Sequence, residues 1–100
     1  MLIIVIRMDI HNDTSMAIEQ IRREIGDRKV VAGAKQLRKA LLSDGVFRVY
    51  LARNADPAIT EPLEALCESK HINYAWVKSM TDLGRACGIE VGAAAAAAIN

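Results

Sequence analysis

Residues 28–52 read RKVVAGAKQLRKALLSDGVFRVYLA. Two runs rich in β-branched and aromatic residues, Arg28–Ala32 and Val46–Ala52, predict a strand at each end of this stretch. Between them, apolar residues recur with helical spacing and predict a helix from just after Gly33 to about Ser43. The apolar stripe of that helix consists of Ala34, Leu37 and Leu41. A strand, a helix and a strand in succession are typical of an α/β fold.

The segment before this stretch predicts one further helix. Ser15 is a candidate N-cap for a helix over Met16–Ile25, because a hydroxyl can accept from the first free N–H groups. Apolar residues with helical spacing, namely Ile18, Ile21 and Ile25, support this helix. Gly26 is a suitable place for it to end.

The first residues of the chain show a different pattern. Leu2–Ile6 is β-branched and strand-like, whereas residues 9–14 have the composition of a loop. We interpret residues 1–15 either as an N-terminal extension or as an over-called start. Residues 16–100 then make a single domain, as expected for a chain of this length.

The alternation continues after the second strand. Asn54-Ala55-Asp56-Pro57 predicts a turn, and Thr60 is a candidate cap for a helix over about Glu61–Lys70. Pro62 would then fall in the first turn, where a missing N–H is tolerated. The inner face of this helix would consist of Leu63, Leu66 and Cys67. Ile72–Val77 predicts the following strand.

A last helix and a last strand complete the pattern. Ser79 stands three residues before Asp82, which is capping-box spacing with Asp in place of Glu, and the helix is expected to end near Cys87, before Gly88. The segment Glu90–Ile99 should contain the final strand. Its alanines are poor strand formers, so we expect helices to pack closely over it. The whole pattern predicts a three-layer α/β/α sandwich on a mixed sheet of about four strands.

The charges of the chain are unevenly distributed. The net charge is only +1, but residues 28–53 hold seven basic side chains and one acidic side chain, a local charge of +6. The basic residues are Arg28, Lys29, Lys35, Arg38, Lys39, Arg48 and Arg53. This cluster is either an ordinary solvated face or an electrostatic footprint for phosphate groups. Aromatic residues make up only 4% and fall in strand-like runs, which argues against base stacking on exposed rings.

The sequence lacks signs of an enzyme, a metal site or a membrane segment. No GxGxxG or Walker motif is present, and the two histidines, His11 and His71, are too few for a metal site of recognisable spacing. Cys87 could act as a nucleophile, but a core cysteine at a helix end is the better interpretation. No apolar run approaches the length of a membrane span. Two unpaired cysteines indicate a reducing compartment, so we expect a cytoplasmic protein.

Two segments carry more information than composition does. They are VVAGAKQLRKAL at residues 30–41 and LGRACGIEVGAA at residues 83–94, with LARNADP at residues 51–57 between them. Together they resemble the kink-turn-binding ribosomal-protein family, which includes the archaeal "L-seven-Ae" and "L-thirty-e" proteins and their small bacterial paralogues. The resemblance covers roughly residues 28–99, with the motifs in the same order. It implies an α/β/α sandwich without catalysis and without a cofactor.

The resemblance also implies an RNA site on the helix after Gly33. Family members bind a kink-turn, an RNA helix bent at a three-nucleotide bulge beside sheared G·A pairs. The backbone at Gly33 and Ala34 would approach phosphates. The two family residues that contact the guanines correspond to Lys35 and Gln36, a pair that differs from the Asn-Glu of the best-known members and resembles the bacterial paralogues. Lys39 matches the phosphate-binding lysine of the family, and Arg38 is an adjacent, weaker candidate.

A second half of the implied site lies in the loop after the last predicted helix. Ile89, Glu90 and Val91 match the family loop whose apolar side chains pack on an unstacked base of the bulge. Taken without the resemblance, Ile89 and Val91 would be core residues. Glu90 would have to contact a base edge or a basic neighbour instead of a phosphate.

The expected function is therefore recognition of kink-turn RNA by a monomeric, ribosomal or translation-associated protein. The RNA partner would be a ribosomal RNA or a messenger leader, and the ribosome is a further expected partner. The alternative is a ribosome-associated structural or protein-interaction module that lacks kink-turn specificity. The departure at Lys35 and Gln36 and the small net charge keep this alternative open.

Overall fold

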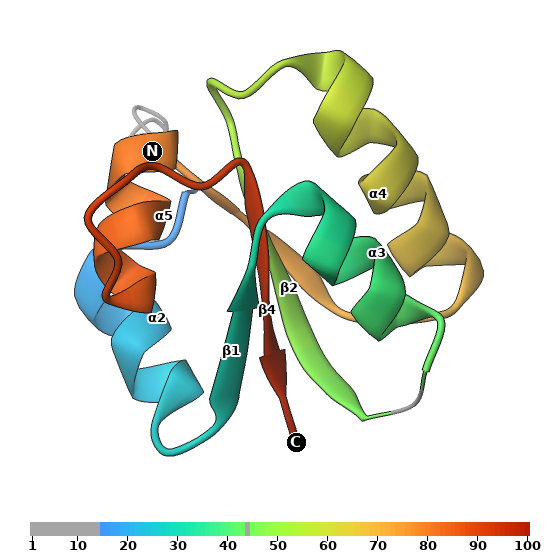
Figure 1. Cartoon of the computed structure of the whole chain (residues 1–100), viewed down its shortest axis with the longest axis horizontal. Coiled ribbons are helices and arrows are strands. Elements are labelled where there is room, and N and C mark those ends of the chain that lie inside the picture. The colour runs from blue at the N-terminus through green and yellow to red at the C-terminus, as the bar shows by residue number, and fades with distance from the viewer. Residues whose placement is uncertain (1–14, 44) are drawn as a thin grey trace, which may run out of the picture.

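A mixed four-stranded sheet forms the centre of the protein. The computed structural model describes residues 15–43 and 45–100. Within them the strands lie in the order β1-β4-β2-β3, with β4 antiparallel to both neighbours and β2 parallel to β3 (Figure 1). Their bounds are Lys29–Ala32 for β1, Val46–Ala52 for β2, Tyr74–Val77 for β3 and Ala95–Ile99 for β4.

Helices cover both faces of this sheet. Helices α2 (Ile18–Ile25) and α5 (Met80–Cys87) pack together on one face, and α3 (Ala34–Leu41) and α4 (Pro57–Ser69) pack on the other (Figure 1). Each face has its own cluster of buried apolar side chains, with Ile21 and Leu83 in the first and Leu37 and Leu63 in the second. The predicted α/β/α sandwich on a mixed four-stranded sheet is confirmed.

The alanines of β4 explain how two pairs of helices can share such a small sheet. Ala95, Ala96, Ala97 and Ala98 are all fully buried. Ala96 and Ala98 belong to the cluster under α2 and α5, whereas Ala95 and Ala97 belong to the cluster under α3 and α4. Successive side chains of a strand point to opposite faces, so small residues let both helix layers approach. The close packing predicted from these alanines is confirmed.

The strand directions place several loops at one end of the sheet. Strands β1 and β2 both run antiparallel to β4, and β3 runs parallel to β2. The chain therefore leaves β1, β2 and β3, and enters β4, at the same end, which we call the carboxyl end. The opposite end, where β1, β2 and β3 begin, we call the amino end. The turn at Gly33 and the loop before β4 meet at the carboxyl end.

The first described helix begins later than the sequence predicted. Helix α2 starts at Ile18, and its N-cap is Ala17, not Ser15. Met16 is extended because its N–H donates to the carbonyl of Trp76 (2.9 Å), so it forms a short parallel bridge beside β3. This long-range hydrogen bond overrides the local capping signal of Ser15. The predicted end of the helix at Gly26 is confirmed.

Helix α4 begins earlier than predicted, and Thr60 does not cap it. The N-cap is Asp56, whose carboxylate accepts from the N–H of Ala58 (2.9 Å), and Pro57 occupies the first helical position. Proline suits that position because its φ is already helical. Pro62 consequently lies inside the helix, not in its first turn, and Thr60 is buried.

The remaining boundaries agree with the sequence more closely. Strand β2 covers the predicted residues, while β1 and β3 start one and two residues later than expected, at Lys29 and Tyr74. Ser79 caps α5 by accepting from the N–H of Asp82 (3.1 Å), and Gly88 ends that helix in a left-handed conformation, both as predicted. The expectations for Leu2–Ile6 and residues 9–14 fall outside the described residues.

Candidate functional site

The turn between β1 and α3 has a backbone conformation that favours glycine. Gly33 has φ 103° and ψ 145°, a region that side chains rarely tolerate, and a Cβ placed there would meet nothing within 4 Å. Its N–H donates to the carbonyl of Ala95 in β4 (2.8 Å), and its carbonyl accepts from Leu37 (2.9 Å). Both backbone groups of Gly33 therefore hold the turn in place, while the space beside its Cα stays open.

The first turn of α3 presents backbone N–H groups at this open surface. Because the N-cap is a glycine, no side chain caps the helix. The N–H groups of Ala34, Lys35 and Gln36 have no acceptor inside the helix, as in any first helical turn. The N–H of Gly33 donates to the carbonyl of Ala95 in β4, so the N–H groups that remain for an anion are those of Ala34, Lys35 and Gln36. The positive end of the helix dipole adds to the attraction for anions.

Helix α3 separates its apolar and polar residues as predicted. Leu37 and Leu41 are fully buried. The four predicted side chains of the helix are exposed to solvent: Lys35, Gln36, Arg38 and Lys39. No acidic residue stands in its first turn. The helix therefore presents a polar, positively charged surface that begins beside the open turn at Gly33.

The loop between α5 and β4 packs directly on its own helix. A Cβ on Gly84 would lie 2.1 Å from the carbonyl oxygen of Val91, so only glycine lets the loop come this close. The N–H of Ile89 donates to the carbonyl of Gly84 (3.0 Å), and the N–H of Ala93 donates to the carbonyl of Met80 (3.0 Å). The conformation of residues 88–93 is therefore set by backbone contacts with α5.

This packing leaves the predicted loop residues at the surface. Val91 is 70% exposed, Ile89 is 37% exposed, and Glu90 is also exposed. The alternative that Ile89 and Val91 are core residues is therefore wrong. Two exposed apolar side chains of one loop are available for contact with another molecule.

The two predicted halves of the site meet around one groove at the carboxyl end. It has a volume of about 310 Å³, and Gly33 lines it together with Ile89 and Val91. The remaining lining residues are Ala32, Ala34, Ile59, Gly92, Ala93 and Ala94. The other predicted residues do not line the groove and lie on the elements beside it. They are Lys35, Gln36, Arg38 and Lys39 on α3, and Glu90 in the loop before β4.

Ile59 is a member of this groove that the sequence did not suggest. It lies in the first turn of α4 and is 38% exposed. The sequence predicts a helix that begins at about Glu61, so Ile59 falls before the predicted helix. The Asp56-Pro57 pair, read as an N-cap followed by a first helical residue, would have placed Ile59 on the helix.

Asn54 joins three of the segments around the site. Its side-chain oxygen accepts from the N–H of Met80 (2.8 Å), the first residue of α5. Asn54 itself lies in the turn between β2 and α4, and the carbonyl of Met80 accepts from Ala93 in the loop before β4. This chain of contacts ties the start of α5 to both neighbouring loops.

The cluster of seven basic residues does not form one surface. Lys35, Arg38 and Lys39 lie on α3. Arg53 lies at the end of β2, where its side chain donates to the hydroxyl of Ser15 and stands over the ring of Trp76. The other three, Arg28, Lys29 and Arg48, lie at the amino end of the sheet. The idea of a single electrostatic footprint is therefore corrected, because sequence neighbours are carried to opposite ends by the strands.

A larger groove lies away from the predicted residues. It has a volume of about 610 Å³ and is lined by Ser15, Met16, Ala17, Ile18, Glu19, Arg22, Lys78, Asp82 and Arg85. Its charged lining residues are of both signs, three basic and two acidic, so it has no strong preference for an anion or a cation. The smaller groove, where the converging loops and the exposed apolar residues lie, is the better candidate site.

Neither cysteine has the properties of a nucleophile. Burial raises the pKa of the half-buried Cys87 thiol. Burial, with smaller contributions from Glu64 and Glu68, raises the pKa of Cys67 to about 11. Both thiols are therefore protonated at neutral pH, whereas a nucleophilic cysteine has to ionise readily.

Two acidic residues of α4 accept hydrogen bonds from Tyr74, the first residue of β3. The hydroxyl of Tyr74 lies within hydrogen-bond distance of Glu68 (2.7 Å) and of Glu64 (3.0 Å), and the two carboxylates share its single proton in hydrogen bonds. These hydrogen bonds, first the one to Glu68, raise the pKa of Tyr74 above its ordinary value.

Over residues 15–43 and 45–100, no group of three or more side chains of the types that bind metal ions is found. No helix in the same residues is long and apolar enough to cross a membrane.

Comparisons with known proteins identify the family. Residues 16–100 match the model of the ribosomal protein L7Ae/L30e/S12e/Gadd45 family. An RNA-binding protein of Bacillus pumilus is 46% identical over 70 residues, which cover 70% of this chain and 85% of the relative. An RNA-binding protein of Caldanaerobacter subterraneus subsp. tengcongensis is 45% identical over 69 residues, 69% of this chain and 84% of the relative.

A solved structure supports the same assignment. The 15.5kD RNA-binding protein of Giardia lamblia has a similar fold, with a TM-score of 0.73 and 26% identity. The match covers 83% of this chain and 70% of that protein. The two proteins therefore share the layered α/β arrangement. This chain therefore belongs to the ribosomal protein L7Ae/L30e/S12e/Gadd45 family.

Proposed function

We propose that this protein binds structured RNA and recognises kink-turns through the groove at the carboxyl end of the sheet. One observation carries the proposal most strongly. Gly33, at the N-terminus of a positively charged helix, lines the same small groove as the exposed Ile89 and Val91. A phosphate-attracting element beside an exposed apolar surface suits an RNA segment that presents a backbone and an unstacked base together. We place the protein in the cytoplasm as a monomer that acts on the ribosome or elsewhere in translation.

The α3 half of the site supplies the polar contacts in this proposal. The open first turn of the helix receives a phosphate at the N–H groups of Ala34, Lys35 and Gln36. Lys35 can donate to guanine O6 and N7, and Gln36 can both donate and accept at a base edge. Lys39 stands one turn further along the exposed face and neutralises a backbone phosphate, with Arg38 as a weaker contributor.

The loop half supplies the apolar contacts. Ile89 and Val91 pack on an unstacked base, and Ile59 on α4 adds a further apolar side chain to the lining of the groove. Glu90 is exposed beside them and accepts from a base amino group, since a carboxylate repels phosphates. The small volume of the groove, about 310 Å³, suits a single base or part of one.

A titration with two matched RNAs tests this proposal. One RNA contains a kink-turn, and its twin has the sheared G·A pairs replaced by Watson–Crick pairs. Both are titrated at ~0.15 M salt, because phosphate contacts alone give apparent affinity at low salt. We expect at least ~100-fold weaker binding of the twin, the order of discrimination available from two good base contacts. Equal binding of both RNAs would instead favour the ribosome-associated module without kink-turn specificity.

A further inference from the structure

The amino end of the sheet carries a second group of basic side chains. Arg28, Lys29 and Arg48 come from the starts of β1 and β2, and Arg28 and Lys29 are exposed. The acidic residues close to them among the described residues are Glu24 at the end of α2 and Asp27 in the turn that follows. This group lies at the opposite end of β1 from Gly33, so it is a separate surface from the groove.

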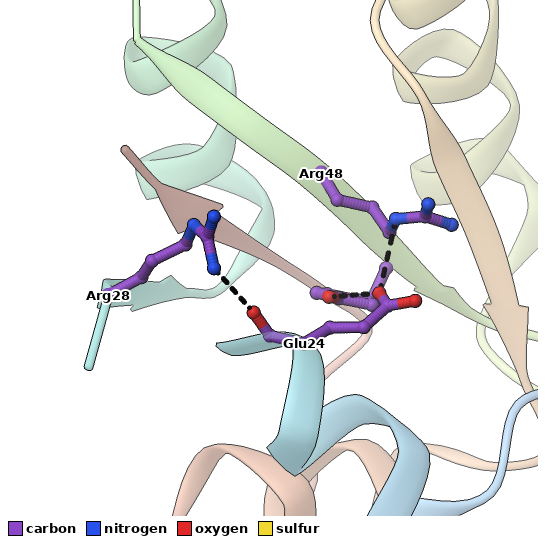
Figure 2. A network of polar contacts seen from close by, with 4 residues as sticks. Glu24, Arg28 and Arg48 are labelled. Atoms are coloured by element: carbon purple, nitrogen blue, oxygen red, sulfur yellow. Dashed lines mark hydrogen bonds and ion pairs between the residues drawn. The ribbon is translucent and has the colours of Figure 1, made fainter. Parts of the chain in front are cut away.

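The carboxylate of Glu24 already has two partners within the protein, Tyr50 and Arg48. Its Oε1 accepts from the hydroxyl of Tyr50 (2.8 Å) and forms an ion pair with Nε of Arg48 (3.1 Å). Figure 2 shows Glu24 reaching between the two arginines, with the terminal nitrogens of Arg48 pointing away from the carboxylate. Glu24 therefore positions Arg48 through a single nitrogen and leaves the outer edge of the guanidinium for another partner.

The guanidinium group of Arg28 is held in place by contacts with uncharged groups. Its Nη1 donates to the backbone carbonyl of Glu24 (2.8 Å), and its guanidinium carbon lies 3.7 Å from the centre of the Phe47 ring (Figure 2 shows the hydrogen bond). Neither a carbonyl nor an aromatic ring carries a formal negative charge, so the positive charge of Arg28 is uncompensated by these contacts. A guanidinium fixed in orientation loses less entropy when it binds a phosphate through two N–H groups.

We infer that Arg28, Lys29 and Arg48 form a second contact for RNA, one that binds backbone phosphates without base selectivity. The occupant is an arm of the same RNA whose motif occupies the groove, and in this respect the inference rests on the proposed function. Gly33 follows Arg28 by five positions in the sequence, roughly 17 Å of extended chain at ~3.3 Å per residue. A duplex of about five base pairs spans that distance at ~3.4 Å per step.

The test uses RNAs that differ only in the length of this arm. One kink-turn RNA ends about two base pairs beyond the motif, and the other continues for about ten. The protein variant is the double substitution Arg28→Gln and Lys29→Gln, and affinity is measured from 0.05 to 0.2 M salt. The salt slope is the steepness with which the logarithm of the binding constant falls as the logarithm of the salt concentration rises. With the long arm, losing two phosphate contacts should lower this slope by about two. The variant should therefore lose roughly tenfold less affinity than the wild type between the two salt concentrations. With the short arm, wild type and variant should coincide.

A charge-matched control separates a site from a general charge effect. The double substitution Lys70→Gln and Lys78→Gln removes two exposed positive charges that stand shortly before and just after β3, the edge strand on the other side of the sheet from β1. It should leave the dependence on arm length unchanged. If it lowers the slope for the long arm as much as the first pair does, the inference is overturned. It is also overturned if the first pair affects both arm lengths equally or neither.

Two further measurements keep the outcome interpretable. Arg28 packs on Phe47, so Lys29→Gln alone is tested as well, and it should lower the long-arm salt slope by about one without changing the unfolding temperature. No change in that slope would count against the inference even if the double variant unfolds. Failure of kink-turn recognition is detected separately, because it shows as equal binding of the motif and its Watson–Crick twin and leaves the comparison of arm lengths intact.

Discussion

The two halves of the candidate site are built in different ways. The α3 half consists of exposed side chains on a regular helix, with Lys35, Gln36 and Lys39 free to be exchanged one at a time. In the loop half, the backbone of residues 88–93 is locked onto α5, where the carbonyl of Val91 occupies the space beside Gly84. Side-chain chemistry decides what the first half binds, and backbone packing decides where the second half lies.

This difference predicts different responses to substitution. A change on the exposed face of α3 should alter binding and leave folding nearly untouched, since surface substitutions away from special features have small effects on stability. A change at the contact between α5 and its loop should alter folding and binding together.

Gly84→Ala should have the largest effect. The added Cβ would lie 2.1 Å from a backbone carbonyl, so the loop has to move, and the free energy of unfolding should fall by about 3 kcal/mol, the upper end of the range for overpacking. Affinity for a kink-turn RNA should fall as well, because Ile89 and Val91 are displaced. Denaturant unfolding and RNA titration check this. Thr81→Ala, at an exposed position of the same helix, is the matched control, and an equally small effect of both changes would contradict the tight contact.

Gln36→Ala should chiefly reduce discrimination between RNAs. If Gln36 contacts a guanine edge, its loss should cost roughly 1–3 kcal/mol of preference for sheared G·A pairs over Watson–Crick pairs. The unfolding free energy should stay nearly constant, because the side chain is exposed. The measurement is a titration of both RNAs at one salt concentration. If the affinity for both RNAs falls equally, Gln36 contacts the RNA backbone and not the bases.

Asn54→Ala should have an intermediate effect that tests the link between the loops. It removes the acceptor for the N–H of Met80 and should lower the unfolding free energy by about 1 kcal/mol, the usual net value of one hydrogen bond. Asn54→Asp retains an oxygen at the same place and should recover most of the loss. Amide hydrogen exchange of residues 88–93 should be faster in the alanine variant only. Unchanged exchange there would show that Asn54 does not support the loop.

Lys39→Ala should have the smallest effect, and one without sequence preference. Loss of one phosphate contact should lower the salt slope by about 0.9 and weaken all RNAs alike. Lys70→Ala, another exposed lysine, is the control and should leave the slope unchanged. A selective loss for one RNA would mean that Lys39 reads a base, and the division of roles between Gln36 and Lys39 would then be wrong.

Local patterns predicted much of the fold and part of the site. The stripe of Leu37 and Leu41 located α3, and the cap at Ser79 located α5, because these signals depend only on neighbouring residues. Ile59 and Asn54 were missed, because their importance comes from segments that approach only after folding. The hydrogen bond from Met16 to Trp76 also forms only after folding. The local sequence does not reveal it and therefore wrongly favours Ser15 as the cap of α2.

The sequence by itself determined the order of strands and helices along the chain, the alanine-rich last strand and the polar face of α3. Periodicity and turn chemistry are local properties, so they are present before the chain folds. Only the tertiary structure decided that Gly33 meets Ile89 and Val91 at one groove, and that Arg28 and Arg48 lie at the other end of the sheet. Strand pairing brings distant residues together and separates near ones, and the position of each charge and each exposed apolar side chain follows from that pairing.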